Sequence, residues 1–325
     1  MKWYLKQHYG RPGDPGLPEM FFDKEKVGHF AISAEDFYAG DDDALFKLLV
    51  ATVMFQRRQD VQIMRVLKNM APETVNEITD PSLLLELADE DGCAALSGLD
   101  ELKATCDLAK HPKTKVGVCQ YNSAYACALK RHTVALKRYG HFGKVPTALA
   151  MALRERGFNA LSELYQDAIS RDGGPTAAAE RIEEVLQSAW RVSDKIAAMY
   201  LSMLTNSALS PGHDAPWAEG VDATKFVVID SNVDLFLKAI DYPGPWTYQR
   251  RREFIEAISE RISLDEFDER LDAYNPRIVQ QAMYLFMSES NRRSLARDCS
   301  MEPSPPCSDC DAAIKTICPR RVAST

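Results

Sequence analysis

No apolar run in this 325-residue chain is long enough to cross a membrane. A membrane-spanning helix needs about 20 mostly apolar residues. The N-terminal segment, MKWYLKQHYGRPGDPGLPEMFF, also lacks the apolar stretch of a secretory signal peptide. We therefore expect a cytoplasmic protein. Thiols stay reduced in that compartment, so clustered cysteines there are expected to bind metals rather than form disulfides.

The chain also has no excess of positive charge. The net charge is −8, which on its own argues against a nucleic-acid-binding protein. The charge is uneven, however: residues 291–325 carry six basic against four acidic side chains, and Arg250, Arg251 and Arg252 form a basic run. A local basic face of this kind can bind phosphate groups despite a negative total charge, with the salt dependence of counterion release.

Alternating strand patterns, internal repeats and low-complexity tracts are also absent. Apolar residues recur instead at helical spacing, and Gly, Pro and Asp clusters end several of the periodic segments. The clearest segments are residues 45–53, 63–70, 161–169, 182–189, 233–240 and 278–286. The sequence therefore predicts an all-α fold, with only the short apolar stretch at residues 226–229 left ambiguous.

One segment interrupts the helical pattern. Residues 205–228 are rich in Pro, Gly and Asp, and long connections of this kind are often functional. We interpret this segment as a crossover between two helical lobes. One lobe is expected to comprise residues 44–205, and the other residues 1–43 together with 206–325.

Four cysteines gather near the C-terminus, with the spacing C-x7-C-x2-C-x7-C over residues 299–318. They are Cys299, Cys307, Cys310 and Cys318. A Cys-x-x-Cys pair can place two sulfurs on one metal or cluster, and the outer cysteines can complete the ligand set. Tetrahedral zinc and a [4Fe-4S] cluster both accept four cysteines. One pair with two single cysteines is less typical of zinc than two Cys-x-x-Cys pairs.

Two polar residues lie where helices are expected to begin. Lys195 follows Ser193 and precedes an apolar helical run, and Asp230 precedes the run that starts at Val233. A lysine at such a position can act as a nucleophile, and an aspartate can stabilise developing positive charge. The simpler interpretations are a solvated surface lysine and an ordinary helix-capping aspartate.

Three short motifs occur in a recognisable order. Residues 53–59 read V-M-F-Q-R-R-Q, residues 189–197 read A-W-R-V-S-D-K-I-A, and residues 229–233 read I-D-S-N-V. Followed by the cysteine array, they resemble the helix-hairpin-helix DNA glycosylase superfamily, whose motifs are V-M-L-Q-Q-T-Q, L-P-G-V-G-x-K-T-A and V-D-T-H-hydrophobic. The resemblance is closest to the endonuclease III and adenine-mismatch glycosylase branch, and it extends from about residue 44 to 320.

The resemblance implies a two-lobed fold with a hairpin at residues 185–200, and a monomer that acts on double-stranded DNA. A damaged or modified base would be flipped out of the duplex and excised. Lys195 would attack the sugar to form a Schiff base, followed by strand cleavage, and Asp230 would stabilise the oxocarbenium ion. Relatives without this lysine use water and only remove the base.

Further roles follow from the same resemblance. The DNA contacts would come from Gln56, Arg57, Arg191 and Ser193, with Gln56 or Arg57 filling the vacated base stack. Arg191 and Ser193 replace the two hairpin glycines that normally let backbone amides approach a phosphate. The four cysteines would ligate one [4Fe-4S] cluster that folds the C-terminal loop, and the enzyme would associate with the nucleoid.

Two other functions remain open from the sequence. The first keeps the fold but changes the substrate, because some glycosylase-like relatives are thought to act on hypermodified pyrimidines in phage DNA. The second is a non-catalytic DNA-binding protein with a structural zinc ion or cluster. The lost hairpin glycines and the longer connections permit the first of these.

Overall fold

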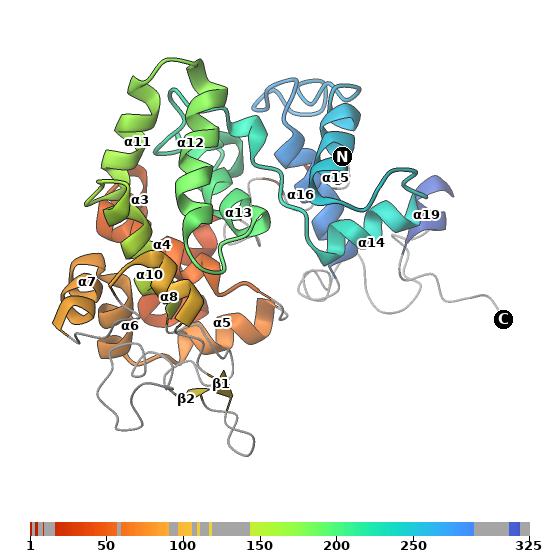
Figure 1. Ribbon diagram of the computed structural model, residues 1–325. Helices are drawn as coiled ribbons and strands as arrows, with labels where there is room; N and C mark the ends of the chain where they lie inside the picture. The colour runs from red at the N-terminus through yellow and green to blue at the C-terminus, as the bar shows by residue number, and fades with distance from the viewer. Residues whose placement is uncertain are drawn as a thin grey trace.

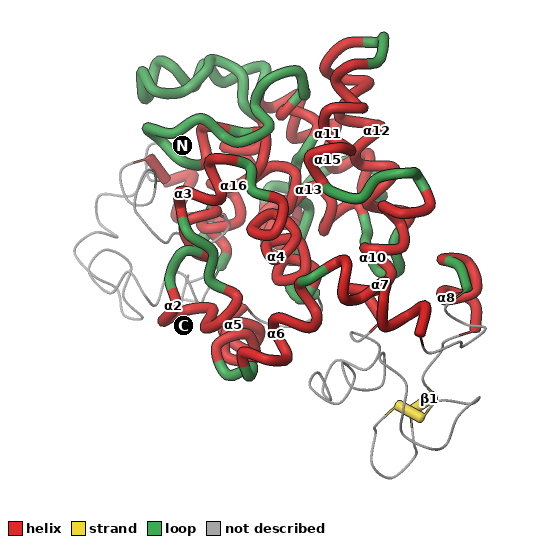
Figure 2. The backbone as a smooth tube through the Cα atoms, turned by 90° about the vertical axis from the view of Figure 1, so that its left-hand side faces the viewer, coloured by secondary structure: helices red, strands yellow, loops and turns green. Residues whose placement is uncertain are grey.

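The computed structural model describes residues 1, 4–5, 9, 17–56, 60–90, 97–105, 109–110, 117–118, 144–288 and 312–318. The regular secondary structure of these residues is almost entirely helical, as the sequence predicts, and the one β pairing among them joins two strands of two residues each. Figure 2 shows how little strand accompanies the helices. In the described part of the chain, no helix is long and apolar enough to span a membrane.

The helical elements fall into two groups along the chain (Figure 1). The first runs from η1 to α13: η1 (Pro18–Phe21), α2 (Lys24–Val27), η2 (Gly28–Phe30), α3 (Ala34–Ala39), α4 (Asp42–Val53), α5 (Asp60–Lys68), α6 (Pro72–Thr79), α7 (Pro81–Glu90), α8 (Leu99–Thr105), β1 (Ala109–Lys110), β2 (Gly117–Val118), α10 (Lys144–Glu155), α11 (Leu161–Ser170), α12 (Gly174–Ser188) and α13 (Asp194–Thr205). The second runs from η6 to α19: η6 (Ser207–Leu209), η7 (Ala223–Lys225), α14 (Ser231–Ala239), α15 (Tyr248–Ser259), α16 (Pro276–Met287) and α19 (Ala312–Ile317).

The first group is organised around α4 and α13, which pack against each other. Every residue of α13 from Ile196 to Thr205 is buried, and so are nine of the twelve residues of α4. A helix that is apolar on all sides is expected in the interior of a domain. The phenol of Tyr200 donates a hydrogen bond to the carbonyl oxygen of Leu45 at 3.1 Å and fixes the register of the two helices.

The buried residues of the described part of the chain form two hydrophobic cores, and their members differ from the expected division of the chain. The first core contains α4, α10, α12 and α13, and it also contains Met20, Phe21, Phe30 and Phe37. We had expected residues 1–43 to join the second lobe. The segment from Met20 onward instead packs on the first, because its aromatic side chains cover α4 and its C-terminal end: Phe21 lies 5.9 Å from Phe55 between ring centroids.

The second core contains Tyr4, Tyr9 and Leu17 together with α14, α15 and α16. Helices α14 and α15 both pack on α16. The N-terminus therefore lies beside α15 in Figure 1.

The ambiguous apolar stretch at residues 226–229 joins the two cores. It has no regular secondary structure. Phe226 and Val228 belong to the first core, whereas Val227 and Ile229 belong to the second. Successive side chains of an extended chain point to opposite sides, so four apolar residues in a row can serve two cores at once. Asp230 follows this segment directly.

A second link between the two packing centres is a pair of buried amides. Asn206, at the end of α13, and Asn275, at the N-cap of α16, exchange two hydrogen bonds of 3.0 Å. Asn275 also caps α16 through the backbone N–H of Ile278. Buried amides that satisfy each other in this way define one relative position of the elements that carry them.

Candidate functional site

Helix α12 ends at Ser188 and α13 begins at Asp194. The residues between them form the turn of the predicted hairpin. Arg191 lies between them with φ +69°, in the left-handed region that favours glycine. The backbone here has the conformation for which a glycine is suited, although the residue is arginine. The side chain is exposed, and its guanidinium lies 4.8 Å from the ring centroid of Trp190.

Gln56, which follows the C-terminal end of α4, contacts this turn directly. Its Nε2 donates to the carbonyl oxygens of Arg191 at 3.0 Å and Val53 at 2.8 Å. The sequence predicts a DNA contact for Gln56 and gives no sign of this hydrogen bond to the turn. Arg57 lies outside the described residues.

Ser193 occupies the N-cap position of α13 as expected, but its side chain makes no capping hydrogen bond. The residue is exposed, and its carbonyl oxygen accepts the N–H of Ala197 at 2.9 Å. Arg191 and Ser193 therefore lie together on the exposed side of the hairpin, while Val192 between them is buried.

Lys195 lies in the first turn of α13, and it is not a solvated surface lysine. Its side chain is half-buried, and Nζ donates to the carbonyl oxygen of Phe55 at 3.1 Å. Phe55 follows the C-terminal end of α4. One N–H of the ammonium group is thus used to fix the side chain, and an ammonium group has two more.

Asp230 is the N-cap of α14. Its Oδ1 accepts the backbone N–H groups of Asn232 and Val233, both at 2.9 Å, so the simple capping role is confirmed. Burial nevertheless raises the pKa of this carboxyl group above its usual value. The two amides and the charge of Lys195 act in the opposite direction, and the negative charge of Asp60 adds to the increase.

Lys195 and Asp230 line one cavity. Its other lining residues come from both packing centres: Met20, Phe55, Asp60, Met199, Val228, Arg277, Gln280, Gln281 and Tyr284. The cavity volume is about 40 Å³, which holds a few water molecules. Two residues 35 positions apart in sequence are thus brought to one small, mixed polar and apolar site between α13, α14 and α16.

One wall of the cavity is a polar stripe on α16. Arg277 is 2% exposed, and its Nη1 donates to Oε1 of Gln280 at 2.7 Å and of Gln281 at 2.6 Å. Its Nε donates to Oγ of Ser202 at 3.1 Å. Burial lowers the pKa of Arg277 to about 10. Sequence reasoning missed this wall, although residues i, i+3 and i+4 share one helix face and three polar residues there interrupt an apolar pattern.

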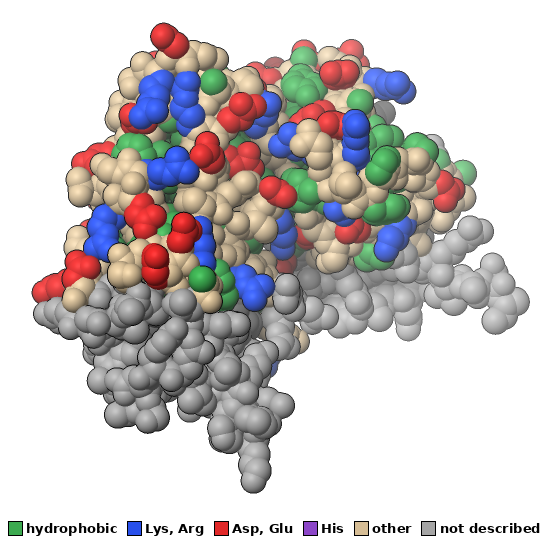
Figure 3. Space-filling view, viewed as in Figure 1, with side chains coloured by type: hydrophobic (Ala, Val, Ile, Leu, Met, Phe, Trp, Pro, Cys, Tyr) green, Lys and Arg blue, Asp and Glu red, His purple; other side chains and the backbone are tan. Residues whose placement is uncertain are grey.

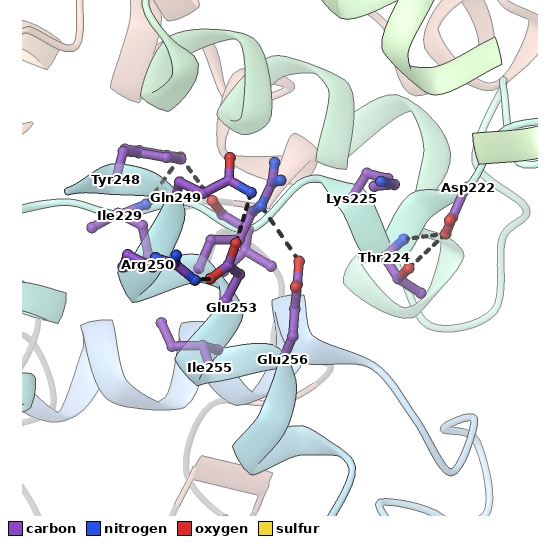
Figure 4. Close-up of polar contacts among 12 residues, drawn as sticks. Asp222, Thr224, Lys225, Ile229, Tyr248, Gln249, Arg250, Glu253, Ile255 and Glu256 are labelled. Atoms are coloured by element: carbon purple, nitrogen blue, oxygen red, sulfur yellow. Dashed lines mark hydrogen bonds and ion pairs between the residues drawn. The ribbon is translucent and has the colours of Figure 1, made fainter. Parts of the chain in front are cut away.

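Helix α15 fixes the segment that leads to Asp230 (Figure 4). Its first residue, Tyr248, donates a hydrogen bond to the carbonyl oxygen of Val227 at 2.7 Å and accepts one from the N–H of Ile229 at 3.3 Å. Burial raises the pKa of the Tyr248 phenol, so the hydroxyl stays protonated and keeps both contacts.

The basic run at the start of α15 is matched by acidic partners. Arg250 pairs with Glu253 at 2.8 Å, Arg252 pairs with Glu256 at 3.5 Å, and Arg251 pairs with Asp234 of α14. The run therefore adds little net positive charge to the surface. Figure 3 likewise shows Lys and Arg side chains interspersed with Asp and Glu over the described part of the face that it displays.

The cysteine array can be located only at its last member. Cys318 follows α19, is half-buried and is not in a disulfide. Cys299, Cys307 and Cys310 lie outside the described residues. Among the residues that the structure does describe, no group of three or more His, Cys, Asp or Glu side chains is arranged to hold a metal ion.

Comparison of this chain with protein-family models, with curated proteins and with solved structures gave no match.

Proposed function

We propose that this protein is a DNA N-glycosylase with abasic-site lyase activity, in which Lys195 and Asp230 carry the chemistry. The observation that supports this proposal most is their convergence on one cavity from the starts of α13 and α14. A solvent-directed lysine far from Asp230 would have favoured a non-catalytic DNA-binding protein. The half-buried Lys195 argues for the enzyme instead.

The proposed reaction uses the two residues in different ways. Breaking the bond between base and sugar develops positive charge on the sugar ring, which the carboxylate of Asp230 stabilises. The amine nitrogen of Lys195 attacks C1′ and displaces the base, and opening of the sugar ring gives a Schiff base. Loss of the C2′ proton then expels the 3′ phosphate by β-elimination, which nicks the strand.

The cap bonds of Asp230 suit this role. Two backbone amides fix Oδ1 in place, so the carboxylate is oriented before the substrate arrives. A preorganised charge of this kind stabilises a transition state without the cost of reorientation. The raised pKa of Asp230 is the consequence of holding it in a partly buried position.

The hairpin is proposed to bind the DNA backbone. Arg191 is exposed and its backbone has the left-handed conformation of the family glycine, so the turn has the shape that brings amides near a phosphate. The guanidinium adds a charged contact that glycine lacks. Gln56 supports the turn from behind, so we propose a positioning role for it, and gap filling in the base stack would fall to Arg57.

A flipped nucleotide needs more space than the cavity offers. About 40 Å³ admits water but no nucleobase. Binding is therefore proposed to move side chains at the cavity mouth, and the polar wall of Arg277, Gln280 and Gln281 would then supply hydrogen-bonding groups for the base edge.

The C-terminal cysteines are proposed to hold a [4Fe-4S] cluster. This assignment rests on their number and spacing. When bound, the cluster would fold the C-terminal loop and present the basic residues of 291–325 to DNA.

The deciding experiment is a panel of duplexes that each carry one altered base. Base release, nicking and borohydride-trapped covalent adduct are measured for the parent, Lys195→Ala and Asp230→Asn. We expect Lys195→Ala to abolish trapping and nicking. Asp230→Asn should slow base release by about 10²-fold or more while DNA affinity stays near that of the parent.

Lys47→Ala serves as the matched control for the lysine change, because Lys47 lies on α4 of the same lobe and does not line the cavity with Lys195. If the two variants process a duplex as well as the parent does, Lys195 and Asp230 do not carry the reaction. If the parent binds DNA but releases no base and forms no adduct on any duplex, the non-catalytic interpretation is correct.

A further inference from the structure

The cavity contains a second carboxylate that the motifs did not point to. Asp60 is the first residue of α5, is half-buried and lines the cavity with Lys195 and Asp230. Its Oδ2 accepts a hydrogen bond of 2.5 Å from the hydroxyl group of Tyr284. Tyr284 lies on α16, 224 positions later, so the contact joins the two packing centres at the cavity.

The two carboxylates are held in different ways. Oδ1 of Asp230 accepts two backbone amides and is fixed as a helix cap. Asp60 receives one hydrogen bond, on Oδ2, and its Oδ1 has no hydrogen-bond partner among the described residues. Hydrogen bonds to a carboxylate favour its charged form. Asp230 is therefore held in one orientation, whereas Asp60 has one oxygen that can accept a further hydrogen bond.

A purely structural bridge is the simpler interpretation of Asp60 and Tyr284. Two observations argue for more. The bridge faces the cavity that contains the proposed nucleophile, and Asp60 is close enough to Asp230 for its charge to raise the pKa of that group. Two carboxylates that interact electrostatically and lie in one cavity with a lysine form an arrangement suited to proton transfer.

We propose that Asp60 is the proton-transfer residue of this site and that Tyr284 is its positioning residue. This role rests on the proposed glycosylase and lyase function, which it deepens.

On an abasic site, Asp60 would transfer protons during formation of the Schiff base between Lys195 and the sugar aldehyde. The carboxylate of Asp60 accepts one proton from the ammonium group of Lys195, and the neutral amine adds to the aldehyde carbon C1′ to give a carbinolamine. Protonated Asp60 then returns the proton to the hydroxyl group, which leaves as water as the iminium ion forms. Two protons of the ammonium group leave nitrogen and end on the departing water, one by way of Asp60 and one by direct transfer to the C1′ oxygen when the amine adds. Nitrogen forms a double bond to C1′, both bonds between C1′ and oxygen break, and Asp60 ends as it began.

The experiment uses the full-length protein and a duplex that already contains one abasic site, so that base release is bypassed. The rate of borohydride-trapped adduct is measured under single-turnover conditions across a range of pH. Asp60→Asn and Tyr284→Phe are compared with the parent. Asp80→Asn and Tyr38→Phe are matched controls, because Asp80 also lies at the start of a helix and Tyr38 also donates to a carboxylate, and neither lines this cavity.

We expect Asp60→Asn to lower the trapping rate by about 10²-fold. Its rate should keep rising towards alkaline pH, because the amine must then lose its proton to solvent. Tyr284→Phe should show a smaller loss and a shifted pH profile, since the carboxylate remains but is less well held. Asp60→Glu should recover part of the rate, and the two controls should match the parent.

A parent-like rate and pH profile for Asp60→Asn would overturn the proton-transfer role while leaving the function of Lys195 intact. If Asp60→Asn does not fold, as judged by its circular dichroism, Tyr284→Phe decides: an unchanged rate and profile would overturn the proposal. If the parent itself forms no adduct on the abasic duplex, both the proposed function and this role are wrong.

Discussion

The side-chain amide of Gln56 and the carbonyl oxygen of Arg191 are joined by a 3.0 Å hydrogen bond across 135 positions of sequence. This contact links the C-terminal end of α4 to the hairpin turn, at the point where the backbone of Arg191 has a positive φ. Gln56, for which the sequence predicts a DNA contact, therefore holds the turn through its side chain. The conformation of Arg191 and its charge can be tested separately.

Arg191→Gly and Arg191→Ala form a matched pair for this test. Both remove the charge and the contact with Trp190, but only alanine retains the cost of the left-handed backbone, about 1–2 kcal/mol. We expect Arg191→Gly to be more stable than Arg191→Ala by about 1 kcal/mol in urea unfolding, the reverse of the usual order. An alanine variant that is the more stable of the two would contradict the observed turn geometry.

DNA affinity should respond in the same way to both of these variants. Loss of one phosphate contact lowers the slope of log affinity against log salt by about one. The slope is measured by titrating an undamaged duplex at several salt concentrations. Equal slopes for the parent and both variants would show that Arg191 makes no phosphate contact.

The pH dependence of stability should reveal the burial of Asp230. Because its pKa is raised in the folded protein, the native state binds more protons than the unfolded state between the ordinary value of 3.8 and the raised value. Stability from this group is therefore greatest at low pH and is lost as pH rises through that window. The ionised Asp230 thus lowers the free energy of unfolding at neutral pH.

Asp230→Asn should then be at least as stable as the parent at pH 7, because asparagine also caps a helix and carries no charge to bury. Its advantage should shrink as pH falls towards 3.8. Urea unfolding at several pH values measures this difference. Asp41→Asn is the control: Asp41 caps α4 through Ala44 at 2.9 Å and is exposed, so its variant should show no comparable pH-dependent gain.

Apolar spacing was sufficient to predict several helices. The periodic segments at 45–53, 161–169 and 233–240 correspond to α4, α11 and α14, because each has a continuous apolar face and a clear start or stop signal. Helix α15 was missed. Only Ile255 and Ser259 of its residues are buried, and it opens with three arginines, so its apolar face is too narrow to show as a periodic pattern.

The candidate site could be predicted only where a local motif marked it. Lys195 and Asp230 each stand at a helix start, and a cap position is readable from neighbouring residues. Asp60 lies on α5, far along the chain from Arg277 and Tyr284 of α16, and no local pattern shows that these residues face one another. Their relation depends on how α5 and α16 meet, which is set by the tertiary packing of both cores.

The cysteine array makes a prediction about composition. Anaerobically purified protein should contain iron and acid-labile sulfide in equal amounts, with the visible absorbance of iron–thiolate charge transfer. Cys307→Ser should lose that absorbance and destabilise mainly the C-terminal lobe, because a ligand network of this kind is part of its fold. Cys127→Ser is the control, since Cys127 lies outside the array. Stoichiometric zinc without iron would contradict the assignment.

Tyr248→Phe tests whether the segment before Asp230 must be held for the reaction. The change removes the hydrogen bonds to Val227 and Ile229 and leaves two backbone groups of that segment without their partner. We expect a loss of about 1–3 kcal/mol in the free energy of unfolding. Base release should also slow, because Asp230 follows the loosened segment directly and its orientation depends on it.

Tyr242→Phe separates this effect from the general cost of losing a phenol. Tyr242 lies in the same core, and its hydroxyl donates to the carbonyl oxygen of Pro245 at 3.1 Å, away from the segment that leads to Asp230. It should lower stability without a matching loss of base release per folded molecule. Single-turnover rates at a temperature where both variants are folded make the comparison. Equal rates for the two variants would show that Asp230 is positioned by its cap bonds alone.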